Sequence, residues 1–192
     1  QRPDLRIYVG CTDAARTMRH FAGASNVEPV RYARGHRVAR LAYAMDGALR
    51  RAQADWAHFQ YFTPLVKRCR WIVTIHDVLF NDFPACFPRG YSALRNVLFP
   101  LSAHRADLLT TVSAYSAARI AHWYRVAPAR IHVLPCGVAP LRDLAGPAES
   151  VPVAEVLAHP GGYLLCVSRF EPRKSQARLL EACLRGRLWE RG

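Results

Sequence analysis

Short apolar runs alternate along this chain with segments in which apolar residues recur at helical spacing. Runs of this kind, rich in β-branched and aromatic residues, are typical of strands buried in a parallel sheet. The run WIVTI in particular predicts a strand that is buried on both faces. The predicted strands are residues 6–10, 56–62, 71–75, 108–112, 131–135 and 163–167.

Between these strands, the apolar positions follow a helical period. Pro100 predicts a kink or a break, because proline has no amide hydrogen to donate to the preceding turn. Ser113 is suited to cap the helix that it precedes. Strands that alternate with helices indicate an α/β fold with a Rossmann-like parallel sheet and helices on both faces. The predicted helices are residues 36–53, 91–105, 113–126 and 175–184.

Prolines and glycines become frequent after residue 139, which indicates a linker between two domains. We place the N-terminal domain at residues 1–140, the interdomain linker at 141–162 and the start of a second Rossmann-like domain at 163–192. One strand and one helix cannot bury a core by themselves. We therefore expect the second domain to continue beyond Gly192.

Composition narrows the class of protein only in part. Hydrophobic residues make up 51% of the chain, which supports a packed core and excludes wholesale disorder. The net charge of +13 favours anionic partners such as nucleotides, phosphates, acidic lipids or nucleic acids, without choosing between them. The richness in arginine and alanine is also typical of a GC-rich genome, which is an alternative explanation for part of the net charge. No apolar stretch reaches the roughly 18 residues of a membrane span.

The six cysteines show no metal-binding pattern, since no pair has CxxC spacing and no histidine pair completes a ligand set. We interpret them as free, buried thiols in a reducing compartment. No metal site is expected.

Ligands of open α/β sheets bind at the carboxyl ends of the strands, so the residues that follow each strand are the candidates for chemistry. His76 and Asp77 follow one strand and could orient a substrate or move protons. Ser113 follows the next, where a helix N-terminus favours anions. The structural alternatives are that His76 only caps its strand and that Ser113 only caps its helix.

Two further strand ends carry candidates. Gly137 permits a positive φ or a close backbone approach, although a plain turn would explain it equally. Arg169 and Lys174 lie in a loop that leads into a helix N-terminus, where they could hold a diphosphate. Solvated surface charge is the alternative for both cations.

Five segments match a known family in order and spacing. The chain resembles the retaining glycosyltransferases of the GT-B fold, of the group 1 or family 4 type that includes mannosyltransferases, over roughly residues 56–184. The segments are HFQYFTPL (58–65), VTIHDVLFNDFPACFP (73–88), RADLLTTVSAYSAARI (105–120), IHVLPCGV (131–138) and YLLCVSRFEPRKSQARLLEA (163–182).

The resemblance implies two facing Rossmann-like domains, with the acceptor on the N-terminal domain and the nucleotide-sugar donor on the C-terminal one. It implies that His76 faces the reaction centre as a catalytic residue, with Asp77 beside it. It places Ser113 at the acceptor side of the cleft. The residues that it assigns to the donor phosphates are Gly137 near the hinge, Arg169 and Lys174.

The activity implied is transfer of a hexose from a UDP- or GDP-sugar to a glycan or a lipid-linked acceptor, with retention of configuration, in bacterial polysaccharide or cell-envelope glycan biosynthesis. The nucleotide-sugar is a substrate, and we expect no cofactor or metal. Nucleic acid is not an expected partner, because no basic helix or recognised motif is present. We expect a cytoplasmic location, with contact to the anionic inner face of the membrane as an added hypothesis.

The chain departs from the family pattern in several places. Ser168 stands where the family has glycine, and Ser175 stands for asparagine while keeping a residue that can cap the helix. The glycine-rich loop after the first strand and the motif of two glutamates separated by seven residues are absent, and we expect them upstream and beyond Gly192. The alternative function is therefore a catalytically incomplete remnant that binds a phosphate ligand or a partner.

Overall fold

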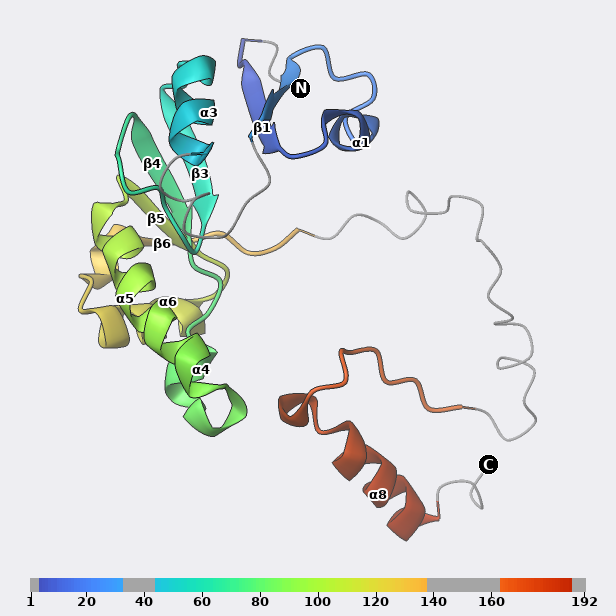
Figure 1. Ribbon diagram of the computed structural model, residues 1–192. Coiled ribbons are helices and arrows are strands. Elements are labelled where there is room, and N and C mark those ends of the chain that lie inside the picture. Colours follow the sequence, from blue (N-terminus) through green and yellow to red (C-terminus); the bar gives the residue numbers. More distant parts are fainter. Residues whose placement is uncertain (1–3, 33–43, 138–162, 188–192) are drawn as a thin grey trace. The chain divides into compact units, whose positions relative to one another are not determined.

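The computed structural model describes residues 4–32, 44–137 and 163–187. The chain forms two compact units, Gln1–Cys136 and Gly137–Gly192 (Figure 1). Within the described residues, every strand belongs to the first unit. The predicted linker at 141–162 lies outside the described residues, and the predicted domain bounds stay predictions.

The central feature of the first unit is a four-stranded parallel sheet. It consists of β3 (Trp56–Gln60), β4 (Arg70–Thr74), β5 (Leu108–Thr111) and β6 (Ile131–Val133), which lie side by side in chain order. The register places Phe59 beside Val73 and Val73 beside Leu109. These strands confirm the predicted α/β fold with a Rossmann-like parallel sheet.

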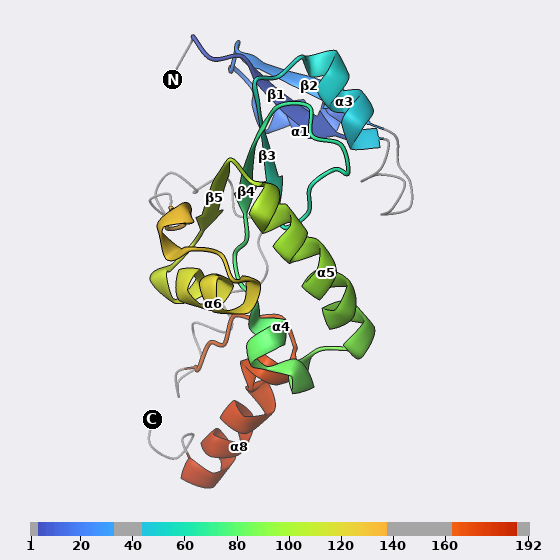
Figure 2. The same cartoon turned by 90° about the vertical axis from the view of Figure 1, so that its left-hand side faces the viewer.

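Two helices cover one face of this sheet (Figures 1 and 2). Helix α5 (Arg89–Arg105) connects β4 to β5, and α6 (Ala114–Tyr124) connects β5 to β6. Right-handed crossovers that advance in one direction place successive helices on the same face. The buried core accordingly joins alternate strand residues to both helices. It includes Phe59, Trp71, Val73, Leu109, Phe99, Ala103, Ile120 and Tyr124.

The opposite face of the sheet is more open. His58 and His132 are exposed there, and Ile72 is only half-buried. The prediction that residues 71–75 are buried on both faces is therefore wrong, and the described helices on the sheet cover one face alone. The open face carries a polar ladder, in which Thr74 Oγ1 lies 2.7 Å from both His58 Nε2 and Thr110 Oγ1.

The N-terminal part adds a small parallel sheet of β1 (Ile7–Cys11) and β2 (Val27–Arg31), with α1 (Ala14–Arg19) between them. The sequence predicted β1 but neither α1 nor β2. Helix α3 (Met45–Ala52) forms the described part of the predicted helix 36–53, whose first residues lie outside the described ranges.

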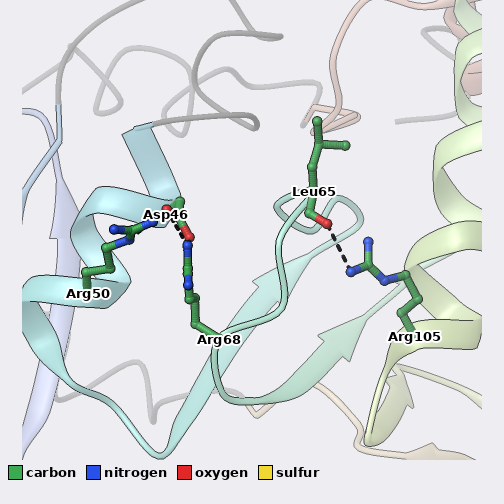
Figure 3. Close-up of polar contacts among 5 residues, drawn as sticks. All are labelled: Asp46, Arg50, Leu65, Arg68 and Arg105. Carbon is green, nitrogen blue, oxygen red and sulfur yellow. Dashed lines mark hydrogen bonds and ion pairs between the residues drawn. The ribbon is translucent and has the colours of Figure 1, made fainter.

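Asp46 connects α3 to the segment that precedes β4 (Figure 3). Its carboxylate accepts hydrogen bonds from Arg50 Nε at 3.0 Å and from Arg68 Nε at 2.7 Å. The Arg68 hydrogen bond lowers the pKa of the Asp46 carboxyl. This ion pair network fixes α3 against the loop between β3 and β4.

Pro100 does not break helix α5, which continues from Arg89 to Arg105. The predicted break is wrong, because Phe99 and Ala103 belong to the buried core and hold the helix on both sides of the missing hydrogen bond, and the alternative of a kink stays a prediction. A short helix that the sequence did not predict, α4 (Leu79–Asp82), follows β4.

The second unit contains a 3₁₀ turn, Pro172–Lys174, and α8 (Gln176–Gly186), which confirms the predicted helix. Residues 163–167 form no strand, so that prediction is wrong. A strand needs a hydrogen-bonded neighbour, and none is present among the described residues. The apolar run YLLCV is accordingly exposed.

The cysteines are free, as predicted, but most are not buried. Cys11 is buried, whereas Cys86, Cys136 and Cys166 are exposed. The prediction of buried thiols is wrong for these three because they lie in turns and in the unpaired segment before α8.

Candidate functional site

His76 lies at the carboxyl edge of the sheet, two residues after the end of β4. The buried residue Ile75 donates its amide to Thr110 O at 3.0 Å. Thr111 Oγ1 then donates to the backbone carbonyl of His76 at 3.4 Å. The neighbouring strand β5 thus fixes the backbone at His76 through hydrogen bonds that do not involve the imidazole ring.

The His76 ring has a partly buried environment with one unused nitrogen. The centroid of the Tyr61 ring lies 5.3 Å from that of His76, at an interplanar angle of 31°. Nε2 of His76 is buried and has no hydrogen-bond partner among the described residues. An imidazole nitrogen either donates or accepts a hydrogen bond. His76 can therefore offer this nitrogen to a hydroxyl or a phosphate oxygen of a ligand, and the alternative that it only caps its strand stays open.

Tyr61 is a site residue that the sequence analysis missed. It follows the last residue of β3 and has a φ of 65°, a left-handed conformation that is unfavourable for an aromatic residue. Its amide donates to Thr74 O at 3.0 Å, and its ring stacks on Phe99 at 5.0 Å. The predicted strand 56–62 included Tyr61 and hid it. If the strand had been predicted to end at Gln60, Tyr61 would have been among the residues that follow a strand and are candidates for chemistry.

The hydroxyl of Tyr61 is a neutral hydrogen-bond donor. Burial, reinforced by the negative charge of Asp77, raises the pKa of Tyr61 to about 12. The same two causes, burial first, raise the pKa of Tyr124. Asp77 Oδ1 accepts a hydrogen bond from the amide of Leu79 at 3.3 Å. Tyr61, His76 and Asp77 thus place a phenol, an imidazole and a carboxylate at one strand edge, a set that can orient hydroxyl groups and move protons.

Asp82, at the end of α4, attaches the His76 loop to α6 through its side chain. Its Oδ1 accepts hydrogen bonds from Arg119 Nε at 2.7 Å and Trp123 Nε1 at 2.8 Å, and its Oδ2 lies 3.3 Å from the Tyr115 hydroxyl. The side chain is only 7% exposed. Burial would raise the pKa of Asp82, but the hydrogen bonds from Arg119 and Trp123 outweigh it and lower the pKa.

We expect Asp82→Asn to destabilise the protein by about 2 kcal/mol at neutral pH, since hydrogen bonds to a charged acceptor contribute more than neutral ones. The folded-state pKa of Asp82 is below its ordinary value of about 3.9. The stabilisation is therefore complete above about pH 4 and is lost as the pH falls through the folded pKa. Urea unfolding over a pH series should show the variant and the parent converge in acid.

The control for this experiment is Glu28→Gln, which removes an exposed pair with Arg6 at 3.8 Å. We expect no measurable change in stability from it. A difference between Asp82→Asn and the parent that stayed constant down to the lowest pH would contradict the charge-based account of this contact.

Ser113 is the N-cap of α6, as predicted. Its Oγ accepts a hydrogen bond from the Ser116 amide at 3.1 Å. Ser113 lies at the carboxyl end of β5, on the strand next to that of His76. The capping role is confirmed, and a role at the acceptor side of a cleft stays a prediction.

Gly137 shows neither feature that we expected of it. Its φ lies outside the left-handed region, and a Cβ placed on it would meet no atom within 4 Å. The described backbone therefore does not require glycine here. Gly137 stands where the second compact unit begins, and its place near the donor phosphates stays a prediction.

The cationic loop belongs to the second unit. Arg169 and Lys174 are exposed, whereas Arg173 is paired with Glu171 at 2.7 Å. The side-chain Nε2 of Gln176 donates to Ser168 Oγ at 2.7 Å and also to the backbone carbonyl of Arg169. The hydrogen bonds of Gln176 thus support the loop without using its cations. Because Arg173 is paired with Glu171, Arg169 and Lys174 are the cations of this loop that remain available to an anion.

Ser175 does not cap α8 with its side chain, so that prediction is wrong. It ends the preceding 3₁₀ turn with a φ of 55°, and no side-chain capping bond forms. A capping side chain requires an extended backbone at the N-cap, which this turn excludes.

Neither a metal site nor a membrane-spanning helix is found among the described residues. No group of three or more His, Cys, Asp or Glu side chains is placed to hold a metal ion. None of the described helices combines the length and the apolar character that a bilayer crossing requires.

The chain is thus an α/β protein with a Rossmann-like parallel sheet, and it carries an imidazole, a phenol and a carboxylate at the edge where proteins of this class bind their ligands. Comparison with protein families gives a match to Glycosyltransferase Family 4 over residues 6–142. The chain belongs to glycosyltransferase family 4, and its fold is consistent with a GT-B-type glycosyltransferase, an enzyme class that acts on a sugar donor and an acceptor. A comparison with curated proteins found no match.

Proposed function

We propose that this protein is a retaining glycosyltransferase that transfers a hexose, in the manner of a mannosyltransferase, from a UDP- or GDP-sugar to a hydroxyl of a glycan or a lipid-linked acceptor. Its setting would be bacterial polysaccharide or cell-envelope glycan biosynthesis. The observation that carries this proposal is the buried Nε2 of His76, at the strand edge of a family 4 domain, which has no hydrogen-bond partner in the described part of the chain.

The acceptor side of the reaction would use the residues after β3 and β4. His76 would hydrogen-bond a hydroxyl of the transferred sugar or of the acceptor through Nε2. The Tyr61 ring lies against the His76 ring on one side, and Asp77 follows His76 directly in the chain. Ser113, on the next strand, would line the same acceptor region.

The donor side would use the second unit. A nucleoside diphosphate gains negative charge as it leaves, and cations that are already in place stabilise that charge. Arg169 and Lys174 are suited to this role because Glu171 neutralises only Arg173. With two cations for the diphosphate, and Gly137 close to it, the proposed mechanism needs no metal ion and no cofactor.

We also propose a cytoplasmic protein that contacts the anionic face of a membrane. The net charge of +13 supports this, since basic residues are attracted to acidic lipid headgroups.

The experiment that tests the proposed activity uses the full-length protein with a panel of UDP- and GDP-hexoses and with glycan and lipid-linked acceptors. We expect release of the nucleoside diphosphate that depends on both donor and acceptor, and a product whose anomeric configuration, read by NMR, equals that of the donor. Release that never depends on an acceptor, from a folded protein, would refute transfer. An inverted product would refute retention.

A further inference from the structure

Helix α4 forms the far end of the His76 loop, and it is too short to be stable by itself. It is a single turn of four residues, Leu79–Asp82. An isolated helix shorter than about 12 residues is marginal in water. Contacts with the rest of the first unit therefore hold α4, and with it the segment that begins at His76.

An apolar contact holds α4 toward the core. Phe80 is buried, and its ring meets that of Phe99 edge-on, with 5.5 Å between the ring centroids. The hydrophobic effect has no preferred direction. This contact thus keeps α4 close to the core, but it does not by itself fix how the turn is oriented.

Asp82 supplies directional contacts at the end of α4. Its three donors, Tyr115, Arg119 and Trp123, recur every four residues along one side of α6. Tyr115 and Trp123 are exposed, yet the hydroxyl of one and the indole N–H of the other are directed at the Asp82 carboxylate. Hydrogen bonds require a narrow range of distances and angles. These four residues, which we call the Asp82 cluster, therefore define both the position and the orientation of α4.

The Asp82 cluster uses a charge where stability alone does not require one. A buried ion pair contributes little more than well-packed apolar residues of the same volume would, because both charges lose their hydration. Apolar side chains could therefore attach α4 to α6 about as firmly, but without a fixed direction. The buried carboxylate indicates that the geometry of the segment 76–82 matters in addition to its stability.

The segment that the Asp82 cluster holds contains two groups of the candidate site. His76 and Asp77 lie at its start, where Thr111 Oγ1 donates to the His76 carbonyl and Asp77 Oδ1 accepts the Leu79 amide at the first residue of α4. A rotation of α4 would thus move Asp77 directly and the His76 ring with it. Displacing a reacting group by about 1 Å can lower a rate by up to about 100-fold.

We propose that Asp82 and Arg119 are positioning residues for the proposed sugar transfer, and that the Asp82 cluster fixes Nε2 of His76 at the place where it meets a substrate oxygen. Neither residue touches the substrate in this account, because both act through His76. The inference rests on the proposed function for its substrate, whereas the placement of His76 by Asp82 is measurable without any reaction.

The experiment is a double-mutant cycle on the full-length protein, with Asp82→Asn, His76→Ala and their combination. Rates of sugar transfer at saturating donor and acceptor are divided by the folded fraction of each sample. We expect Asp82→Asn to lower kcat per folded molecule at least about tenfold. In the His76→Ala background the same change should lower kcat less than about twofold, since the group through which Asp82 acts is already absent.

The matched control is Asp107→Asn, which removes a carboxylate that pairs with Lys67 at 2.7 Å and accepts the Trp71 amide at 2.6 Å. Asp107 precedes β5 and so lies at the amino edge of the sheet, away from His76. Its loss should lower stability without lowering kcat per folded molecule. A milder variant, Trp123→Phe, removes a single donor from the Asp82 cluster. It should give a smaller loss of kcat that also disappears in the His76→Ala background.

Hydrogen exchange gives a readout that needs no reaction. Asp82→Asn should speed amide exchange in the peptide that covers residues 76–83 and leave the peptide that covers β5 unchanged. Equal losses of kcat in both His76 backgrounds, an unchanged kcat, or unchanged exchange at 76–83 would each overturn the proposal. If the parent transfers no sugar while exchange responds as expected, the proposed activity is rejected and the placement of His76 by Asp82 stands.

Discussion

His76→Ala is expected to lower kcat for sugar transfer by at least about 100-fold, the range in which a positioned proton-transfer or hydrogen-bonding group contributes. The backbone of His76 is fixed from both sides, by Thr111 at its carbonyl and by α4 after it, so removing the ring should leave the loop in place. Only the buried Nε2 and its contact with Tyr61 would be lost.

The matched control for His76 is His132→Ala. His132 lies on β6, is exposed and faces the open side of the sheet, so its loss should change kcat less than about twofold. Initial rates at saturating donor and acceptor, together with thermal unfolding of each variant, separate a catalytic effect from a loss of structure. Equal rates for His76→Ala and the parent would remove His76 from the reaction centre.

Trp71→Ala is expected to reduce the free energy of unfolding by about 3–5 kcal/mol, the usual cost of removing a large aromatic side chain from a core. Trp71 is 0% exposed, and its ring meets that of Phe59 edge-on at 5.6 Å. Arg105 and Lys67 lie over the same ring. The substitution would leave a cavity beneath the sheet and remove two cation–π contacts at once.

Two companion variants test the cause of that loss. Trp71→Phe should cost clearly less than Trp71→Ala, because it keeps a ring and removes an indole N–H that has no partner among the described residues. Trp56→Ala, at a position that is 44% exposed, should cost less than about 1 kcal/mol even though Arg70 lies over its ring. Urea unfolding of the three variants checks this order. A Trp71→Ala protein as stable as Trp56→Ala would show that Trp71 is not central to the core.

The sequence was sufficient for the inner strands of the central sheet. Residues 71–75 and 108–112 were predictable because a continuous apolar or β-branched run has few alternatives in an α/β chain. Strand β2 was not, since Glu28 and Pro29 interrupt its pattern, and a two-stranded sheet leaves both of its strands at an edge, where proline is tolerated. The run at 163–167 has strand composition but no neighbouring strand in the described residues, and composition alone does not make a sheet.

The candidate site was predictable to the same extent. The rule that ligands bind at the carboxyl ends of strands identified His76 and Ser113 as candidates, because both follow strands whose ends were clear in the sequence. It missed Tyr61 because the apolar pattern of β3 runs past the true end of the strand. The Asp82–Arg119 contact joins residues that are 37 positions apart, and neither residue stands out in the sequence. Only the packing of α4 on α6 brings them together.

The left-handed backbone at Tyr61 has a consequence for how this protein tolerates change. Glycine or asparagine would suit a φ of 65° better than tyrosine does, whereas the contacts with His76 and Phe99 require an aromatic ring. The backbone conformation and the ring contacts therefore favour different residues at one position. If variants were chosen for thermal stability alone, we expect Tyr61 to be replaced, and the contact with His76 would be lost.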